Sequence, residues 1–280
     1  MDGHLSPARH HLKMETVSVI IPTWNRASTI ERAVKSALNQ SYSVSEVLVC
    51  DDGSTDRTKE ILQSIGDDRI KFIEGARAGR PAIPRNRGIA QAKGNWIAFL
   101  DSDDAWLPEK IAKQIAAAEK NNCKASCTNA FRVIPGKGRT GNYLSYPENI
   151  ITFEKILVSN YVICSSALIH KSVIEKSGKF PESDLLKAIE DYALWLRVAL
   201  QTDFAYVEEC LVDYTDDAEN SIRADAVEHV QRERVLEDFW NWLKKNPEFA
   251  NASRLGKIKK SLRVAMKNNG RSFLERIAIK

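Results

Sequence analysis

The chain has 280 residues, of which 43% are hydrophobic and 28% are charged, and its formal net charge is +4. This length and composition are ordinary for a globular protein and allow one large domain, or one domain with an appendage. They argue against an integral membrane protein, because no apolar run approaches the roughly 18 residues of a membrane-spanning helix.

The first half of the chain alternates strand and helix patterns after a polar start, residues 1–15, which lacks the apolar core of a secretory signal and is expected to be a flexible tail. Apolar runs bounded by turn residues predict buried parallel strands. The predicted strands are residues 17–21, 47–50, 70–73 and 96–100. The first predicted helix starts near Ser28, which forms a capping-box pattern with Glu31. The second follows the cap residue Asp56. The third starts at Arg85 and ends at Gly94. Alternation of this kind predicts βαβ units and an α/β fold.

The second half of the chain is less regular. Its predicted elements are a helix from Pro108 to about Asn121, a strand at 124–134, a glycine-rich loop at 135–147, a strand at 161–169 and an amphipathic helix at 187–201. Two further helices, at about 223–245 and 253–268, are expected to close the chain.

Two of the predicted strands end in clusters of aspartates. Residues 47–50 precede Asp51, Asp52 and Asp56, and residues 96–100 precede Asp101-Ser102-Asp103-Asp104. In an open α/β sheet, ligands bind beyond the carboxyl ends of the strands, so both clusters are expected to face one crevice. Converging carboxylates repel one another unless a cation or hydrogen-bond donors hold them. Aspartates at a strand end suit Mg²⁺ or Mn²⁺ with phosphate oxygens and water as its other ligands.

Simpler interpretations of each cluster stay open at this point. The first cluster has the composition of an Asx turn followed by a helix cap at Asp56. The second has the composition of the first turn of a helix. A phosphatase of the haloacid dehalogenase type also uses Asp-x-Asp after a strand, but this chain has Ala105 where such enzymes have Thr or Val.

Taken together, four ordered motifs resemble the family 2 glycosyltransferases, which have a GT-A fold. The motifs are Val19-Ile20-Ile21-Pro22-Thr23-Trp24-Asn25-Arg26, the two aspartate clusters, Arg85-Asn86-Arg87-Gly88 and Glu190-Asp191, within residues 16–222. The resemblance implies a GT-A type, Rossmann-like fold with a mainly parallel central sheet flanked by helices. It also implies a nucleotide-binding half at 16–105, an acceptor-binding half at 106–222 and a helical, basic C-terminal extension at 223–280.

The same resemblance implies a role for each site residue. The nucleotide-binding residues would be Pro22, Thr23, Asn25, Asp51, Asp52, Arg80, Arg85, Asp101 and Ser102. Asp103 and Asp101 would hold Mn²⁺ or Mg²⁺, and the acceptor site would be Glu190 and Asp191, with Asp191 as the general base. This chemistry is physically consistent, because a cation neutralises the departing diphosphate, a carboxylate removes the acceptor proton, and a single displacement inverts the anomeric centre. Without the upstream motifs, Glu190-Asp191 reads as a helix-surface pair beside Arg197.

One segment departs from the family pattern. Many relatives have a Tyr-Arg-x-His-x-x-Asn segment, and here Thr215 and Asp217 replace the Arg and His. The departure leaves open a non-catalytic nucleotide-sugar-binding or scaffold protein with the same fold. A sugar nucleotidyltransferase is disfavoured, because its glycine-rich nucleotide loop is absent near the first strand. Trp24 and Trp106 are expected to flank the crevice and to be able to stack on a base or sugar.

The expected function is transfer of a hexosyl or N-acetylhexosaminyl group from a nucleotide-diphosphate sugar, with a UDP-sugar expected, to a glycan or lipid-linked acceptor. Such transfer would serve surface polysaccharide, lipopolysaccharide or glycolipid assembly. Acceptor specificity is expected to lie within residues 134–190.

Two features bear on location. The five cysteines are odd in number and scattered, without zinc-ligand spacing, which favours free thiols in a reducing cytoplasm. Residues 251–280 hold nine Lys and Arg against Glu275 alone, a net charge of +8. This segment predicts either a helix on an anionic membrane surface, at the inner face of the plasma membrane, or a helix packed on the body of the protein. Nucleic-acid binding is not expected, because Phe273 is the only aromatic residue among these basic residues.

Overall fold

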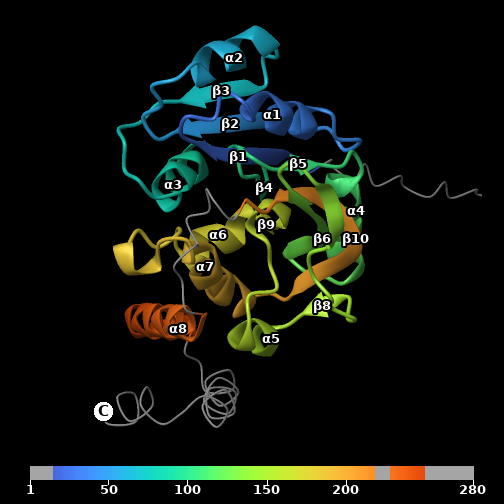
Figure 1. The fold of residues 1–280 in the computed structure, drawn as a ribbon. Coiled ribbons are helices and arrows are strands. Elements are labelled where there is room, and N and C mark those ends of the chain that lie inside the picture. The colour runs from blue at the N-terminus through green and yellow to red at the C-terminus, as the bar shows by residue number, and fades with distance from the viewer. Residues whose placement is uncertain (1–14, 218–227, 250–280) are drawn as a thin grey trace, which may run out of the picture.

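The computed structural model describes residues 15–217 and 228–249, which form a mixed α/β fold around one sheet (Figure 1). The strands are β1 (Val17–Thr23), β2 (Glu46–Asp51), β3 (Ile70–Ile73), β4 (Trp96–Phe99), β5 (Ala105–Trp106), β6 (Ala125–Ile134), β7 (Gly138–Asn142), β8 (Ile150–Ile151), β9 (Leu168–His170) and β10 (Phe204–Thr215). The helices are α1 (Ile30–Leu38), α2 (Thr58–Ile65), α3 (Ala82–Gln91), α4 (Lys110–Lys120), α5 (Phe153–Val158), α6 (Lys171–Ser177), α7 (Glu190–Ala199) and α8 (Glu228–Lys245). The strand order is β3-β2-β1-β4-β9-β6-β10-β5, with β7 paired to β6 and β8 paired to β10.

The first half of the sheet has the predicted parallel arrangement. Strands β3, β2, β1 and β4 run parallel, and Val19 of β1 lies in register with Val47 of β2 and Ala98 of β4. Thr23 lies opposite Asp51, so the segments that follow β1 and β2 leave the same edge of the sheet. The predicted helix starts are close to the observed ones, but the cap residue of α1 is Thr29 and not the predicted Ser28, and the side chain of Thr29 makes no capping hydrogen bond. Asp56 does accept a hydrogen bond from the backbone N–H of Thr58 at the start of α2.

The second half of the sheet is mixed, and here the sequence predictions were partly wrong. The predicted strand at 161–169 overlaps β9 only at Leu168 and Ile169, because Cys164–Ser166 form a 3₁₀ turn. The predicted loop at 135–147 contains β7, which pairs antiparallel with β6. Strand β10, which lies between β6 and β5, was not predicted from the sequence. The pairing of β10 with β6 shifts register around Glu208 and Glu209, which are both exposed. These two residues interrupt the alternation of apolar and polar residues by which a strand is predicted.

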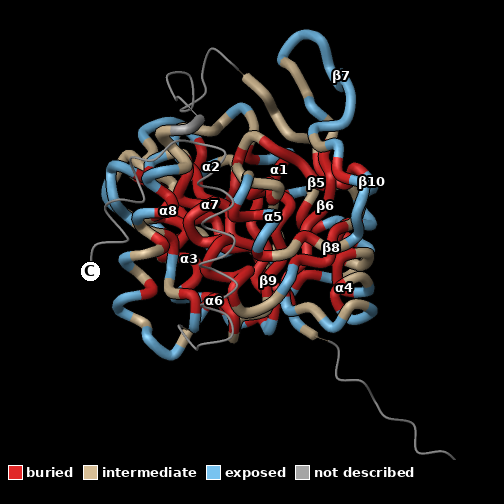
Figure 2. The backbone as a smooth tube through the Cα atoms, turned by 90° about the horizontal axis from the view of Figure 1, so that it is seen from below, coloured by how far each residue is buried: buried red, intermediate tan, exposed pale blue. Residues whose placement is uncertain are grey.

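Helices cover both faces of the sheet, and each face has its own apolar core. Ile20 and Leu48 belong to a cluster with α3, α5, α6, α7 and α8. Val19 and Ile21 point the other way and pack with α1, α2 and α4. Figure 2 shows this buried centre in red, with the exposed β7 hairpin projecting from it.

The predicted C-terminal helical extension is present as α8, which packs on the core through Val235 and Phe239. The predicted helix at 253–268 lies outside the described residues. Within 15–217 and 228–249, no helix is long and apolar enough to cross a membrane.

Candidate active site

The turn after β4 forms the centre of the candidate site. The backbone N–H of Asp101 donates to the Oγ of Ser165 at 3.0 Å, and Ser165 in turn donates to the buried carboxylate of Asp104. The other oxygen of Asp104 accepts the N–H of Thr215 at 2.7 Å. The turn that carries Asp101 and Asp103 is therefore fixed to the 3₁₀ turn at 164–166 and to the end of β10.

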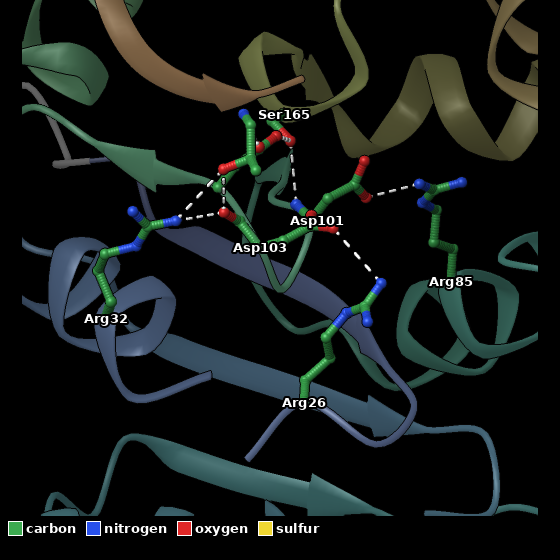
Figure 3. A network of polar contacts seen from close by, with 8 residues as sticks. Arg26, Arg32, Arg85, Asp101, Asp103 and Ser165 are labelled. Carbon is green, nitrogen blue, oxygen red and sulfur yellow. Dashed lines mark hydrogen bonds and ion pairs between the residues drawn. The ribbon is translucent and has the colours of Figure 1, made fainter. Parts of the chain in front are cut away.

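Three arginines from separate elements surround this turn (Figure 3). Arg26, after β1, lies with its Nη2 3.4 Å from Asp103 Oδ2. Arg32, on α1, donates to the carbonyl oxygen of Asp103. Burial, together with repulsion from Asp101, raises the pKa of Asp103 despite the opposing effect of Arg26. The carboxylate therefore lies where negative charge is crowded, and a further cation would stabilise it.

Arg85, on α3, connects the aspartate turn to the start of α7. Its guanidinium lies 2.6 Å from Asp101 Oδ1 and 2.7 Å from Glu190 Oε1, and only 5% of its side chain is exposed. Burial alone would lower the pKa of Arg85, but Asp101 and Glu190 raise it well above its ordinary value. Arg85 and Glu190 were predicted as a nucleotide contact and a catalytic residue, and the structure joins them in one buried ion network.

A first cavity of about 180 Å³ opens at the carboxyl edge of β1, β2 and β4. Most of the predicted nucleotide-binding residues line it, namely Pro22, Thr23, Asp52, Arg80, Arg85, Asp101 and Ser102, together with Asp103. Two predicted residues do not line it. Asn25, with a φ of 50°, accepts the N–H of Thr55, and Asp51 accepts the N–H groups of Gly53 and Ser54. Both side chains shape the turns beside this cavity.

Asp52 holds the loop that forms one wall of the first cavity. Its carboxylate accepts the N–H groups of Ala78 and Gly79, each at 2.9 Å, and pairs with Arg77. The guanidinium of Arg77 in turn lies 3.8 Å from the centre of the Trp24 ring, which is 42% exposed and lines the cavity. Arg77 was not among the predicted site residues, although its position between Gly75 and Gly79 indicated a loop near the crevice.

Arg80, which was predicted to bind the nucleotide, lines the first cavity and also contacts the second half of the chain. It donates to the carbonyl oxygen of Glu182 and lies 3.0 Å from Asp184. The other tryptophan expected at the crevice, Trp106, is buried and donates its Nε1–H to the carbonyl oxygen of Ser165 at 2.7 Å. The expectation that Trp106 flanks the crevice was wrong, because Trp106 belongs to β5, which pairs with β10 inside the sheet. Its hydrogen bond to Ser165 supports the aspartate turn from within the protein.

A second cavity, of about 510 Å³, adjoins the first and shares Arg26, Arg85, Asp101 and Asp103 with it. Glu190 and Asp191 also line this second cavity. Asp191 lies in the first turn of α7, three residues after Ala188, whose φ is 69°, and its Oδ1 accepts the N–H of Tyr192. The structure thus brings the two predicted carboxylate pairs, separated by about ninety residues of chain, to one cavity.

The segment that departs from the family pattern also reaches this cavity. Thr215 donates to the carbonyl oxygen of Asp103 and receives a hydrogen bond from Arg32, so it ties the end of β10 to the aspartate turn. Asp217 lines the second cavity together with Asp103. The replacements therefore lie at the site.

The residues of the aspartate turn suit a divalent cation that has other ligands besides protein. Among the described residues, no group of three or more His, Cys, Asp and Glu side chains is placed to hold a metal. Asp101 and Asp103 nevertheless line both cavities, and Asp101 raises the pKa of Asp103. One or two carboxylates with substrate phosphate oxygens and water are the ligand set that Mg²⁺ commonly has. The donor set fits that arrangement.

Comparison with known proteins decides the family. Residues 18–178, more than half of the chain, match the profile of the family described as "Glycosyl transferase family 2". The protein belongs to this family. It is a glycosyltransferase, and its curated relatives include glycosyltransferases of polysaccharide assembly.

Two of those relatives show the extent of the similarity. The Escherichia coli protein "UDP-Glc:alpha-D-GlcNAc-diphosphoundecaprenol beta-1,3-glucosyltransferase WfaP" is 38% identical over 185 residues, 66% of this chain and 70% of that protein. The Bacillus subtilis (strain 168) protein "Putative teichuronic acid biosynthesis glycosyltransferase TuaG" is 31% identical over 201 residues, 71% of this chain and 78% of that protein.

Solved structures confirm the predicted fold. S. aureus TarS, residues 1–349 in complex with UDP, superimposes with a TM-score of 0.59 and 23% identity over 81% of this chain and 71% of that chain. A longer TarS chain is covered over only 43% of its length, with a TM-score of 0.62. This likeness shows the fold, which is of the GT-A type.

Proposed function

We propose that this protein transfers a sugar from a UDP-sugar to a hydroxyl group of a lipid-linked glycan, with inversion at the anomeric carbon. One observation carries the proposal: a single cavity is lined by Asp103, suited to a metal and diphosphate, and by Asp191, suited to a general base. Displacement at an anomeric carbon needs these two functions around one reaction centre, one at the leaving group of the donor and one at the attacking hydroxyl of the acceptor.

The donor occupies the first cavity in this proposal. Thr23 and Asp52 line the part that would take the nucleoside, with Trp24 beside them. The diphosphate would lie at Asp101 and Asp103, which would hold Mn²⁺ or Mg²⁺. When bound, the cation supplies neutralisation of the charge that grows on the leaving diphosphate.

Asp191 acts as the base in this proposal, and Glu190 supports the site. The Oε1 of Glu190 is engaged by Arg85 at 2.7 Å, whereas Asp191 faces the acceptor side and also lines a third cavity. Asp191 takes the proton of the acceptor hydroxyl as the hydroxyl oxygen bonds to the anomeric carbon. Because the proposed reaction is a single displacement, the anomeric configuration of the product is opposite to that of the donor.

The similar proteins guide the choice of substrates. The name of WfaP gives UDP-Glc as donor and alpha-D-GlcNAc-diphosphoundecaprenol as acceptor, and TarS has been solved with UDP and with UDP-GlcNAc. The donor proposed here is therefore a UDP-hexose or UDP-N-acetylhexosamine, and the acceptor is a diphosphate-linked glycolipid. Such an acceptor would place the protein at the cytoplasmic face of the plasma membrane.

Calorimetric titration tests the donor site. UDP, GDP, dTDP and CMP are each titrated with Mn²⁺ and again with EDTA, on the unaltered protein and on the Asp103→Ala variant. The proposal expects binding of UDP that EDTA and the substitution both abolish, while the matched control Asp68→Asn, at an exposed aspartate, keeps it. Equal UDP binding with and without metal would refute the role of Asp103.

Transfer assays test the base. Asp191→Asn is expected to keep UDP affinity and to lower transfer by at least about 100-fold, since general-base catalysis contributes about 10²–10⁴-fold. Unchanged transfer in this variant would refute the assignment. UDP binding without transfer from any UDP-sugar would favour the non-catalytic alternative.

Membrane recruitment through residues 251–280 is a separate part of the proposal and lies outside the described residues. Its support is the net charge of +8 in that segment. Co-sedimentation with anionic vesicles is expected to fall when residues 251–280 are deleted and to stay low with neutral vesicles. Equal binding by the truncated protein would refute recruitment through this segment.

A further inference from the structure

A third cavity, of about 290 Å³, adjoins the second cavity on its acceptor side. The two cavities share Ala188, Asp191 and Tyr214, whereas, among residues 15–217 and 228–249, none that lines the first cavity lines the third. The three cavities therefore follow one another, with Asp103 at the first junction and Asp191 at the second. A molecule in the third cavity would reach Asp191 from the side away from the donor.

The wall of the third cavity has an aromatic and amphipathic character. Tyr143, next to β7, and Tyr214, at the end of β10, pack edge to face with their ring centres 4.7 Å apart. The polar residues Ser159, Asn160 and Gln231 also line the cavity. A pyranose ring has apolar C–H faces and a rim of hydroxyl groups, so it matches rings and amide or hydroxyl groups placed in this way.

Exposure of apolar side chains also points to a ligand here. Four large hydrophobic side chains are exposed among the described residues, namely Trp24, Tyr143, Val158 and Leu185. Trp24 lines the first cavity, and both Tyr143 and Val158 line the third. The exposed apolar surface is thus concentrated where substrates would bind.

Two side chains of opposite charge line the third cavity. Among its described lining residues only Asp191 and Arg232 are charged. Arg232, on α8, donates from Nη1 to the carbonyl oxygen of Val158 at 3.3 Å, which places its guanidinium beside the exposed end of α5. A ligand with a hydroxyl group near Asp191 and an anionic group near Arg232 would match the sign of each side chain.

We propose that the third cavity binds the sugar-phosphate end of the acceptor. The pyranose ring packs on Tyr143 and Tyr214, its reacting hydroxyl points to Asp191, and its phosphate group lies at Arg232. This inference rests on the proposed function, because it takes Asp191 as the base. Tyr214 and Arg232 lie beyond residue 178, where the family match ends, so acceptor selection extends beyond the stretch 134–190 expected from the sequence.

Binding measurements on the full chain loaded with UDP and Mn²⁺ test the inference, since no transfer occurs without a donor sugar. Two probes are used: short-chain alkyl α-D-GlcNAc-diphosphate, and octyl α-D-GlcNAc, which lacks phosphate. Tyr143→Ala is expected to weaken both probes by about tenfold, and Tyr143→Phe to retain binding, because the ring does the packing. Arg232→Gln is expected to weaken only the diphosphate probe, by about tenfold or more.

The controls separate this inference from the proposed function. Arg234→Gln, at an exposed position two residues along α8, is expected to leave both probes unaffected. UDP affinity must stay unchanged in every variant, which shows that each is folded. If UDP binds but neither probe does, or if Tyr143→Ala and Arg232→Gln leave both affinities unchanged, the acceptor subsite is refuted and the donor site stands. If UDP itself does not bind, the proposed function fails, and the subsite fails with it.

Discussion

Arg85 lies buried between two carboxylates that come from opposite halves of the chain, and its removal is expected to damage both stability and donor binding. In the Arg85→Met variant, Glu190 remains with 5% of its side chain exposed and without its cation. Among the described residues, the other carboxylate oxygen, Glu190 Oε2, already has no hydrogen-bond partner. Removing one partner of a buried ion pair costs about 3–5 kcal/mol, so we expect the free energy of unfolding to fall by that amount.

Urea unfolding followed by tryptophan fluorescence measures the loss, with Arg80→Met as the matched control. Arg80 pairs with Asp184, whose side chain is 81% exposed, so the control is expected to lose about 0–1 kcal/mol. The double variant Arg85→Met/Glu190→Gln is expected to recover part of the loss, because the uncompensated charge is gone. UDP binding in the presence of Mn²⁺ is also expected to weaken in Arg85→Met, since Asp101 loses its 2.6 Å partner. A loss no larger than that of Arg80→Met would refute the reasoning.

Three further predictions concern other parts of the molecule. Burial lowers the pKa of Lys110 well below 10.5, so the unfolded chain binds more protons than the folded one up to that pH, and stability of the unaltered protein is expected to rise with pH there. The rise in the free energy of unfolding is at most about 1.4 kcal/mol per pH unit for one group. It is expected to be absent in Lys110→Met when urea unfolding at pH 7 is compared with urea unfolding at pH 9.5. Gly88→Ala places a Cβ 2.7 Å from a methyl carbon of Ile20 and is expected to cost about 1–3 kcal/mol in the same assay. Asp52→Asn replaces the carboxylate that accepts the N–H groups of Ala78 and Gly79 and pairs with Arg77 by a neutral amide. These contacts are expected to weaken, and calorimetry is expected to show weaker UDP binding.

Each of these predictions has a result that would contradict it. Parallel pH profiles for the unaltered protein and Lys110→Met would show that the lysine keeps an ordinary pKa. Full stability in Gly88→Ala would mean that α3 moves away from β1 at little cost. Unchanged UDP affinity in Asp52→Asn would separate the loop at 77–79 from nucleotide binding.

Much of the candidate site followed from local signals. Asp51 and Asp101 each stand directly after an apolar run, and parallel strands bring their carboxyl ends to one edge of a sheet. The same signal could not say which aspartates would face the cavity. The structure shows that Asp51 closes its own turn while Asp52, one residue further, lines the cavity.

Partners far apart in the chain could not be read from the sequence. Arg85 meets Glu190 across 105 residues, and Thr215 meets the carbonyl oxygen of Asp103 across 112. Neither contact has a local pattern, because each depends on where β9 and β10 enter the sheet. β10 itself was missed because a register shift at Glu208 and Glu209 breaks the apolar alternation.

The sequence by itself determined the parallel half of the sheet, the aspartate turns at its edge and the resemblance to a glycosyltransferase family. Hydrophobic periodicity and turn residues are local properties, and they are sufficient for the strands and the turns, whereas the resemblance depends on four ordered motifs. Only the tertiary structure decided that Arg85 is buried between two carboxylates, that Trp106 supports the aspartate turn from inside the sheet, and that Tyr143 and Arg232 line a cavity with Asp191. Those arrangements depend on burial and on contacts between distant segments, which arise only when the helices and strands pack together.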